Sequence, residues 1–247
     1  MITKILKSMI VIFISIVLIN VHIAFAEPGI QINSHAEYAD GGLISKTSVY
    51  YIVTDPQGQR LGYDPSTKQR YTEFEGGYGA EGIDDVYTVV ADVIPVDGNY
   101  TVEVIGDGLM VFSVEIAMYR EIVGEGLSTM EISGLTDKGL TSKFQMAYNS
   151  DPSKPAGSVV RVASPSNLKQ DIALSRKIGW IDSDGIMMSL YKKAEAIEKS
   201  MSKDDKTTAK NQIEAFMNEV NAQKGKHIKD EAVKILLEDA QYIMEHL

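Results

Sequence analysis

The spacing of apolar residues changes once along this 247-residue chain, and that change sets the strongest limit on its fold. Before about residue 162, apolar positions such as Phe112, Val114 and Ile116 alternate with polar or small ones. A period of two indicates strands with one buried face. From Asp182 onward, apolar residues recur at steps of three or four, which indicates amphipathic helices. We therefore predict an α+β fold whose strands and helices are segregated along the chain.

Residues 27–178 are predicted to form an antiparallel β-sandwich of the immunoglobulin-like kind. Candidate strands rich in β-branched and aromatic residues are separated by Gly, Pro and Asp, and they cover residues 48–54, 86–94, 100–105, 109–119 and 143–148. The sequence Gly106-Asp107-Gly108 joins two of them and is predicted to be the turn of a hairpin. Residues 151–167 contain Pro and Gly and are expected to be a late loop of the sandwich.

Residues 179–247 are predicted to form a three-helix bundle. Each helix has one apolar stripe, and the stripes are Ile186, Leu190, Ala194, Ile197 and Met201; Ala209, Ile213, Phe216 and Val220; and Val233, Leu236, Ala240, Ile243 and Leu247. Residues 182–184 and 204–205 offer side-chain acceptors for the N-caps of the first two helices. Gly225 stands where the end of a helix favours a left-handed residue.

Residues 1–26 are predicted to be a removable secretory signal peptide. Lys4 and Lys7 precede an apolar run over residues 9–19, and Ala24 and Ala26 occupy the positions that signal peptidase reads. The run is shorter than the roughly 20 residues of a bilayer span, and an uncleaved N-terminal anchor is the alternative. No later stretch of the sequence is apolar enough to cross a membrane, so we expect a secreted or periplasmic protein.

The net charge and the absence of cysteine exclude several classes of partner and of chemistry. Two of the 24 basic residues lie within residues 1–26, so 22 remain against 34 acidic residues, a net charge of −12. An acidic surface repels phosphates, which argues against nucleic acid as a partner. The sequence contains no cysteine, which excludes disulfides, a lipid-modified cysteine anchor, thiol nucleophiles and cysteine-ligated metals.

The predicted bundle resembles the FIMAH domain, a helical module appended to many secreted bacterial proteins. The resemblance rests on Gly179-Trp180-Ile181, Gly185-Ile186, Ser189-Leu190, residues 215–223, Gly225, Ile228 and Ala232. Lys229 departs from it, because the module usually has Ser before its last helix and Lys cannot cap that helix; we expect this end either to fray or to be capped by Asp230. The resemblance implies a helical fold and an exported setting, and it implies no catalytic activity. Residues 53–69 also resemble a segment of exported bacterial proteins with immunoglobulin-like folds.

No constellation of residues predicts an enzyme. Only His35, His227 and His246 lie beyond the predicted signal peptide, and the nucleophile motif Gly-x-Ser-x-Gly is absent. A zinc site would need these three histidines to converge from distant elements. Residues 182–185 (Asp-Ser-Asp-Gly) resemble part of a calcium loop, but Trp180 stands where such a loop needs an acidic residue. Helix capping explains these residues, so no cofactor is expected, and Ca²⁺ is the alternative.

One Gly-rich stretch combines aromatic and acidic residues and is the candidate ligand-contacting loop. Its members are Tyr71, Glu73, Phe74, Tyr78, Asp84 and Asp85. Aromatic rings stack against sugars while carboxylates accept hydrogen bonds from hydroxyls; the alternative is an ordinary solvated connection. Trp180, the single tryptophan, is expected to anchor the two parts of the chain to each other or to hold a partner.

These features predict an exported, non-catalytic accessory protein that binds another extracytoplasmic protein or an envelope glycan. The alternative is a carbohydrate-binding protein or a small glycan hydrolase, whose paired carboxylates would come from the Gly-rich stretch. The missing acid–base and nucleophile motifs favour the first interpretation.

Overall fold

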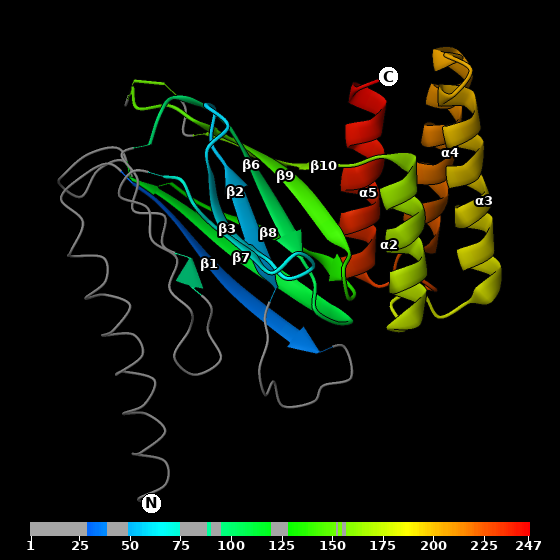
Figure 1. Cartoon of the computed structure of the whole chain (residues 1–247). Helices are drawn as coiled ribbons and strands as arrows, with labels where there is room; N and C mark the ends of the chain where they lie inside the picture. The colour runs from blue at the N-terminus through cyan, green and yellow to red at the C-terminus, as the bar shows by residue number, and fades with distance from the viewer. Residues whose placement is uncertain are drawn as a thin grey trace, which may run out of the picture.

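The computed structural model describes residues 29–38, 49–74, 88–89, 95–119, 128–151, 153–154 and 157–247. Within these ranges, ten strands form two antiparallel sheets, and four helices follow them. Figure 1 shows the sheets on one side of the molecule and the helices on the other. The predicted α+β fold with segregated strands and helices is thus confirmed. The predicted signal peptide lies outside the described residues.

Both sheets are antiparallel throughout their described pairings. The four-stranded sheet has the order β5 (Thr88–Val89), β1 (Gly29–Tyr38), β7 (Met110–Tyr119) and β8 (Ser128–Thr136). The six-stranded sheet has the order β10 (Val159–Val162), β9 (Thr141–Tyr148), β6 (Gly98–Ile105), β2 (Tyr50–Thr54), β3 (Arg60–Asp64) and β4 (Gln69–Thr72). Strands β8 and β10 are therefore edge strands of different sheets, and both lie on the side that faces the helices (Figure 1).

The core of the sandwich lies between the two sheets, where alternate side chains of each strand point inward. In β7 the buried side chains include Phe112, Val114 and Ile116, as the period of two predicts. Strand β9 buries Phe144 and Met146 in the same way. The rings of Phe112 and Phe144 meet edge to face across the core with their centroids 6.3 Å apart.

The predicted hairpin around Gly106-Asp107-Gly108 is wrong. Strand β6 pairs with β2 and β9, whereas β7 pairs with β1 and β8, so the connection passes from one sheet to the other. The N–H of Gly106 donates to the carbonyl of Leu140 at 3.0 Å, and the N–H of Gly139 donates to the carbonyl of Gly106 at 2.9 Å. The alternation of apolar and polar residues reveals which side chains are buried. It does not reveal whether two strands pair in one sheet or lie in opposite sheets, because the period is two in both cases.

The bundle has four helices and not the predicted three. They are α2 (Pro165–Lys177), α3 (Asp184–Met201), α4 (Lys206–Gln223) and α5 (Asp230–Glu245). The helical part thus begins at Pro165 and not at Gly179, and the segment expected to be a loop contains β10 and the start of α2. The sequence held a signal for α2, because Ser164 caps the helix, Pro165 occupies its first turn and Asn167 completes a capping box.

The other helix ends follow the predicted chemistry with one exception. The side chains of Ser183 and Asp205 cap α3 and α4, and Gly225 has a φ of 69°, in the left-handed region. Helix α5 has no side-chain cap at Lys229. Instead, the backbone N–H of Lys229 donates to the carbonyl of Trp180 at 2.9 Å. The N-terminus of α5, which lacks a side-chain cap, is therefore held by backbone pairing with the segment before α3.

The helices pack around their own apolar core and against the edge of the sandwich. That core includes Leu168 of α2, Leu190 of α3, Phe216 of α4 and Leu236 of α5, all fully buried. Helices α2 and α5 lie next to the sheets, with α2 beside β8 and α5 beside β10, while α3 and α4 form the outer layer (Figure 1). Among the described residues, no helix combines the length and apolarity needed to span a membrane.

Candidate functional site: the junction between sandwich and helices

A buried ion cluster joins the sandwich to two helices. Arg161 on β10 donates from Nε to Asp239 Oδ1 on α5 at 2.6 Å and from Nη2 to Asp171 Oδ2 on α2 at 2.5 Å. The side chains of Arg161, Asp171 and Asp239 are only 5%, 1% and 0% exposed. The cluster thus fixes one edge strand to both inner helices through groups that have lost their water.

The cluster places two carboxyl groups against a single cation. Burial raises the pKa of Asp239 well above its ordinary value, and the carboxyl of Asp171 raises it further, although Arg161 opposes both effects. Burial alone would lower the pKa of Arg161, but its attraction to Asp239 and Asp171 outweighs burial and raises it. A proton on Asp239 leaves one positive and one negative charge in the cluster, which is the balanced arrangement in a dry site.

Gly134 on β8 makes room for the guanidinium of Arg161. A Cβ atom at this position would lie 2.9 Å from Arg161 Nη1 and 2.6 Å from Cζ of the buried Phe112 ring. Nη1 itself has no hydrogen-bond partner among the described residues. The arginine therefore occupies a space between the edges of both sheets that exists only because β8 has a glycine there.

An apolar layer lies beside the ion cluster. Leu135 of β8, Leu174 of α2 and Ile235 of α5 are buried against one another, and Trp180 packs partly buried against this layer and against the helical core. Trp180 therefore lies between the two parts of the chain. An ion pair at the rim, between Lys177 Nζ and Asp137 Oδ2 at 2.6 Å, also joins α2 to the β8–β9 loop.

A groove opens at the same junction, with a volume of about 510 Å³. Its walls come from both parts of the chain: β8, β9 and β10 on one side, α4 and α5 on the other. The residues that line it are Glu131, Ile132, Ser133, Phe144, Val159, Val160, Arg161, Met217, Lys234, Leu237, Glu238, Gln241, Tyr242, Glu245 and His246. This volume lies in the range of small-molecule and peptide sites.

Polar groups of the groove are arranged along α5 and β8. Glu131 accepts a hydrogen bond from Ser113 Oγ at 2.6 Å, and Glu245 accepts one from Gln241 Nε2 at 2.6 Å. His246 stacks on Tyr242 with ring centroids 3.9 Å apart. Its Nδ1 lies 2.8 Å from the carbonyl of Tyr242, which requires the proton on Nδ1 because a carbonyl only accepts.

Three residues of the predicted ligand-contacting loop, Tyr71, Glu73 and Phe74, are described, and none of them lines this groove. Tyr71 and Phe74 are 8% and 5% exposed, and Tyr71 is further covered by the guanidinium of Arg60, 4.0 Å from the ring centroid. Glu73 accepts from the backbone N–H of Arg60 at 2.9 Å. Tyr78, Asp84 and Asp85 lie outside the described residues, so the loop stays a prediction.

The residues considered for calcium have other partners in the structure. Asp182 Oδ1 lies 2.8 Å from His227 Nδ1, Asp184 Oδ1 accepts from Arg176 Nε at 2.6 Å, and Ser183 caps α3. In the part of the chain that the structure describes, no group of three or more His, Asp or Glu side chains is placed to hold a metal ion.

Sequence reasoning missed the groove and the ion cluster. One signal was present, because Asp171 and Asp239 interrupt the apolar faces of their helices and Arg161 interrupts a run of valines. Charged residues are rarely buried unless paired, so three of them at buried positions indicate a shared partner. No spacing in the sequence, however, says that these three positions meet.

These observations define a class of protein: an antiparallel β-sandwich whose edge is fixed to a helical module, with a groove at their junction. The helical module is similar to the FIMAH domain, since the family model of that name matches residues 165–245. The match confirms the resemblance found in the sequence, and it includes α2, so the similarity begins at Pro165 and not at the predicted Gly179. No curated protein and no solved structure is significantly similar to the chain.

Proposed function

We propose that this chain is an exported, non-catalytic binding protein that holds a partner in the groove between its sandwich and its FIMAH domain. The observation that carries the proposal is the composition of the groove walls, since β8 and β10 supply one wall and α5 the other. Neither part of the chain forms this surface alone. The proposed role therefore belongs to the complete two-part molecule.

The buried junction supports this role because it holds the two walls in one arrangement. Arg161 lines the groove and also binds Asp171 and Asp239 beneath it. Binding surfaces gain affinity when their walls are already in place, since less ordering is required on association.

Two further observations support export and the absence of catalysis. The N-terminal segment has the composition of a signal peptide, and the FIMAH domain is a module of secreted proteins. His246, the histidine that lines the groove, donates a hydrogen bond from Nδ1 to the carbonyl of Tyr242, and its ring is stacked on Tyr242. Such an imidazole is held in place as part of the groove wall, with no serine hydroxyl among its described hydrogen-bond partners.

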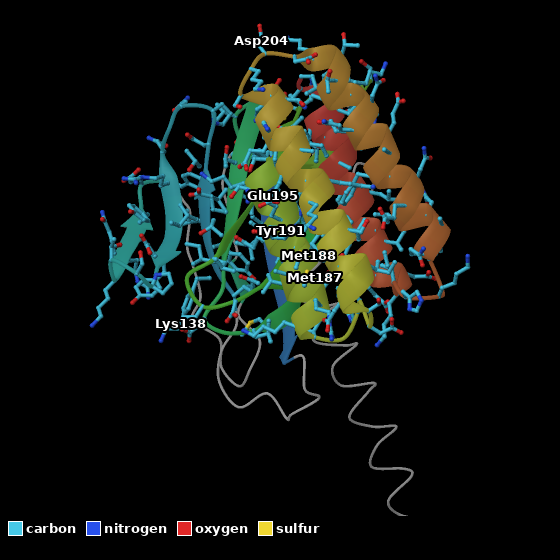
Figure 2. All side chains as sticks on the ribbon, turned by 90° about the vertical axis from the view of Figure 1, so that its right-hand side faces the viewer. Lys138, Met187, Met188, Tyr191, Glu195 and Asp204 are labelled. Carbon is cyan, nitrogen blue, oxygen red and sulfur yellow. The ribbon has the colours of Figure 1, made fainter. Side chains whose placement is uncertain are left out.

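Site-specific cross-linking tests the binding role. A photoreactive residue at Gln241 in the groove is compared with one at Glu195 on the outward face of α3, labelled in Figure 2. Both proteins are expressed in the native cell with residues 1–26 intact. We expect this chain to be found outside the cytoplasm with an N-terminus near Glu27. We also expect it to form a cross-link to a partner from position 241 and none from position 195. Equal products from both positions, or none, would contradict the proposal.

Turnover of an envelope glycan tests the absence of catalysis. Purified chain is incubated with peptidoglycan and with the exopolysaccharide of the native cell, and released reducing ends are measured. We expect no release above that of a heat-denatured sample. Release that disappears when Glu131, Glu238 and Glu245 are changed to Gln would instead establish the glycan hydrolase.

A further inference from the structure

The groove follows the free edges of two strands. Three consecutive residues of β8, 131–133, and three of β10, 159–161, line it. Consecutive side chains of a strand point to opposite faces, so a surface that touches all three meets the edge of the strand. We infer that the groove binds an extended polypeptide segment with apolar and basic side chains, which adds to the edge of β10. This inference rests on the proposed function and narrows the chemistry of the partner.

The backbone of β10 presents the groups that an added strand requires. Strand β10 pairs with β9 on one side and has no strand on its other side in the described sheet. The N–H of Ala147 donates to the carbonyl of Ser158 at 3.0 Å, so these two residues form a hydrogen-bonded pair. Bonded and non-bonded pairs alternate in an antiparallel ladder, which directs the N–H and C=O of Val159 and Arg161 away from β9. Arg161 is buried beside α2 and α5, so the groups of Val159 are the ones open to an added strand. Peptide segments bind sheet edges through such groups.

The apolar surface of the groove suits the side chains of an extended segment. Val160 on the free edge is 44% exposed, whereas most large apolar side chains of the described residues are covered. Ile132, Leu237 and Met217 also line the groove. Alternate side chains of a bound strand would cover this surface.

The charge of the groove favours a basic segment. Three carboxylates line it: Glu131 on β8 and Glu238 and Glu245 on α5. The positive charge of Arg161 is neutralised by its ion pairs with Asp171 and Asp239. Lys234 is then the one lysine or arginine among the lining residues left to balance the three glutamate carboxylates. Lysine or arginine side chains on the outer face of an added strand would balance this excess.

The same lining disfavours a glycan. Sugar rings stack on exposed aromatic faces, but the Phe144 ring at the base of the groove is 1% exposed and Tyr242 is stacked with His246. Val159, Val160 and Ile132, which line the groove, are aliphatic, whereas a sugar would need hydrogen-bonding groups there.

The test uses the chain without residues 1–26 and a fluorescein-labelled peptide of about seven alternating lysines and valines, the length of an ordinary strand. A second peptide replaces every lysine with glutamate. Fluorescence anisotropy gives the affinities, and amide NMR shifts locate the peptide on the protein. We expect the basic peptide to bind at least about tenfold more tightly than the acidic one. We also expect it to shift the amides of Val159 and Arg161.

Two variants of the groove test its charge preference and the backbone hydrogen bonds at the edge of β10 separately. Glu238→Lys with Glu245→Lys should weaken binding of the basic peptide about tenfold. The matched control, Glu195→Lys with Glu214→Lys, makes the same charge change on the outer helices and should leave binding unchanged. Val159→Pro removes one donor from the free edge but no bond to β9, and should weaken binding without unfolding the sheet. If it does unfold, methylation of the peptide's own amides tests the same bonds.

The outcomes separate this inference from the proposed function. Absence of binding at about 1 mM peptide, equal binding of both peptides, or shifts confined to residues outside the groove would overturn the inference. A hexasaccharide of N-acetylglucosamine that shifts groove amides, where the basic peptide does not, would also overturn it and leave the binding role of the groove intact. If the cross-link from position 241 is absent as well, the proposed function itself fails.

Discussion

The guanidinium of Arg161 joins strand β10 to helix α5, because its Nε donates to Asp239 Oδ1 at 2.6 Å in a site where both side chains are almost fully buried. The two residues are separated by 78 positions in sequence. Their contact therefore exists only when the sandwich and the FIMAH domain have docked. Four predictions test how this junction and the helices beside it are stabilised.

Removal of the arginine should destabilise the chain strongly. Arg161→Met leaves Asp171 and Asp239 buried without their cation, and such losses cost about 3–5 kcal/mol. Lys224→Met is the control, since its ion pair with Asp230 is 54% and 74% exposed and is worth at most about 1 kcal/mol. Urea unfolding monitored by Trp180 fluorescence measures both. Equal losses in the two variants would show that the buried cluster contributes no more than a surface pair.

The stability of the junction should fall as pH rises. The folded pKa of Asp239 lies above its unfolded value of about 3.9, because burial disfavours its charged form. The native state therefore binds the extra proton, so this contribution is complete below the unfolded pKa and is lost as pH rises through the folded pKa. Asp239→Asn cannot lose a proton. The parent should thus lose unfolding free energy relative to the variant as pH rises above the unfolded pKa and through the folded pKa of Asp239.

Asp137 provides a comparison of opposite sign for that experiment. The hydrogen bond from Lys177 lowers the pKa of Asp137, so its contribution is present above the unfolded pKa and is lost as pH falls. Asp137→Asn should therefore lower the free energy of unfolding near neutral pH and leave it unchanged in strong acid. A parent-to-variant difference for Asp239→Asn that stays constant from acid through neutral to alkaline pH would contradict the raised pKa of Asp239.

Gly134→Ala should destabilise the chain because there is no space for the methyl group. The new Cβ would lie 2.6 Å from the Phe112 ring and 2.9 Å from Arg161 Nη1, and overpacking of this kind costs about 1–3 kcal/mol. Gly185→Ala is the matched control. Its Cβ would have Ser183 Oγ at 3.7 Å as its nearest neighbour, within a helix that alanine favours. Thermal melting should show a lower Tm for the first variant and an unchanged or higher Tm for the second.

Lys229→Ser should stabilise α5, whose N-terminus has no side-chain cap. Residue 229 has φ −70° and ψ 155°, the extended conformation that a capping serine adopts. We expect a gain of about 1 kcal/mol in urea unfolding. The converse change, Ser164→Ala, removes the capping box of α2 and should cost about the same. Unchanged stability in Lys229→Ser would mean that the backbone pairing with Trp180 already satisfies this helix end.

The sequence by itself determined which side chains are buried and where most helices begin. The period of two in β7 and β9, the stripes of α3 to α5 and the caps at Ser183 and Asp205 are local, because each depends on residues a few positions apart. The signals of α2 are equally local, but the Pro and Gly residues around them also favour a loop. The FIMAH resemblance also rested on local motifs, and the family match confirmed it.

Only the tertiary structure decided which strands share a sheet and which surfaces meet. Alternation is the same whether β6 and β7 pair with each other or face each other across the core, so the sheet-to-sheet connection at Gly106 was invisible. The meeting of Arg161 with Asp171 and Asp239, and the groove above it, depend on how the helices dock on two strand edges. That docking depends on the apolar surface buried and the charges paired between segments far apart in the sequence. No short stretch of sequence contains this information.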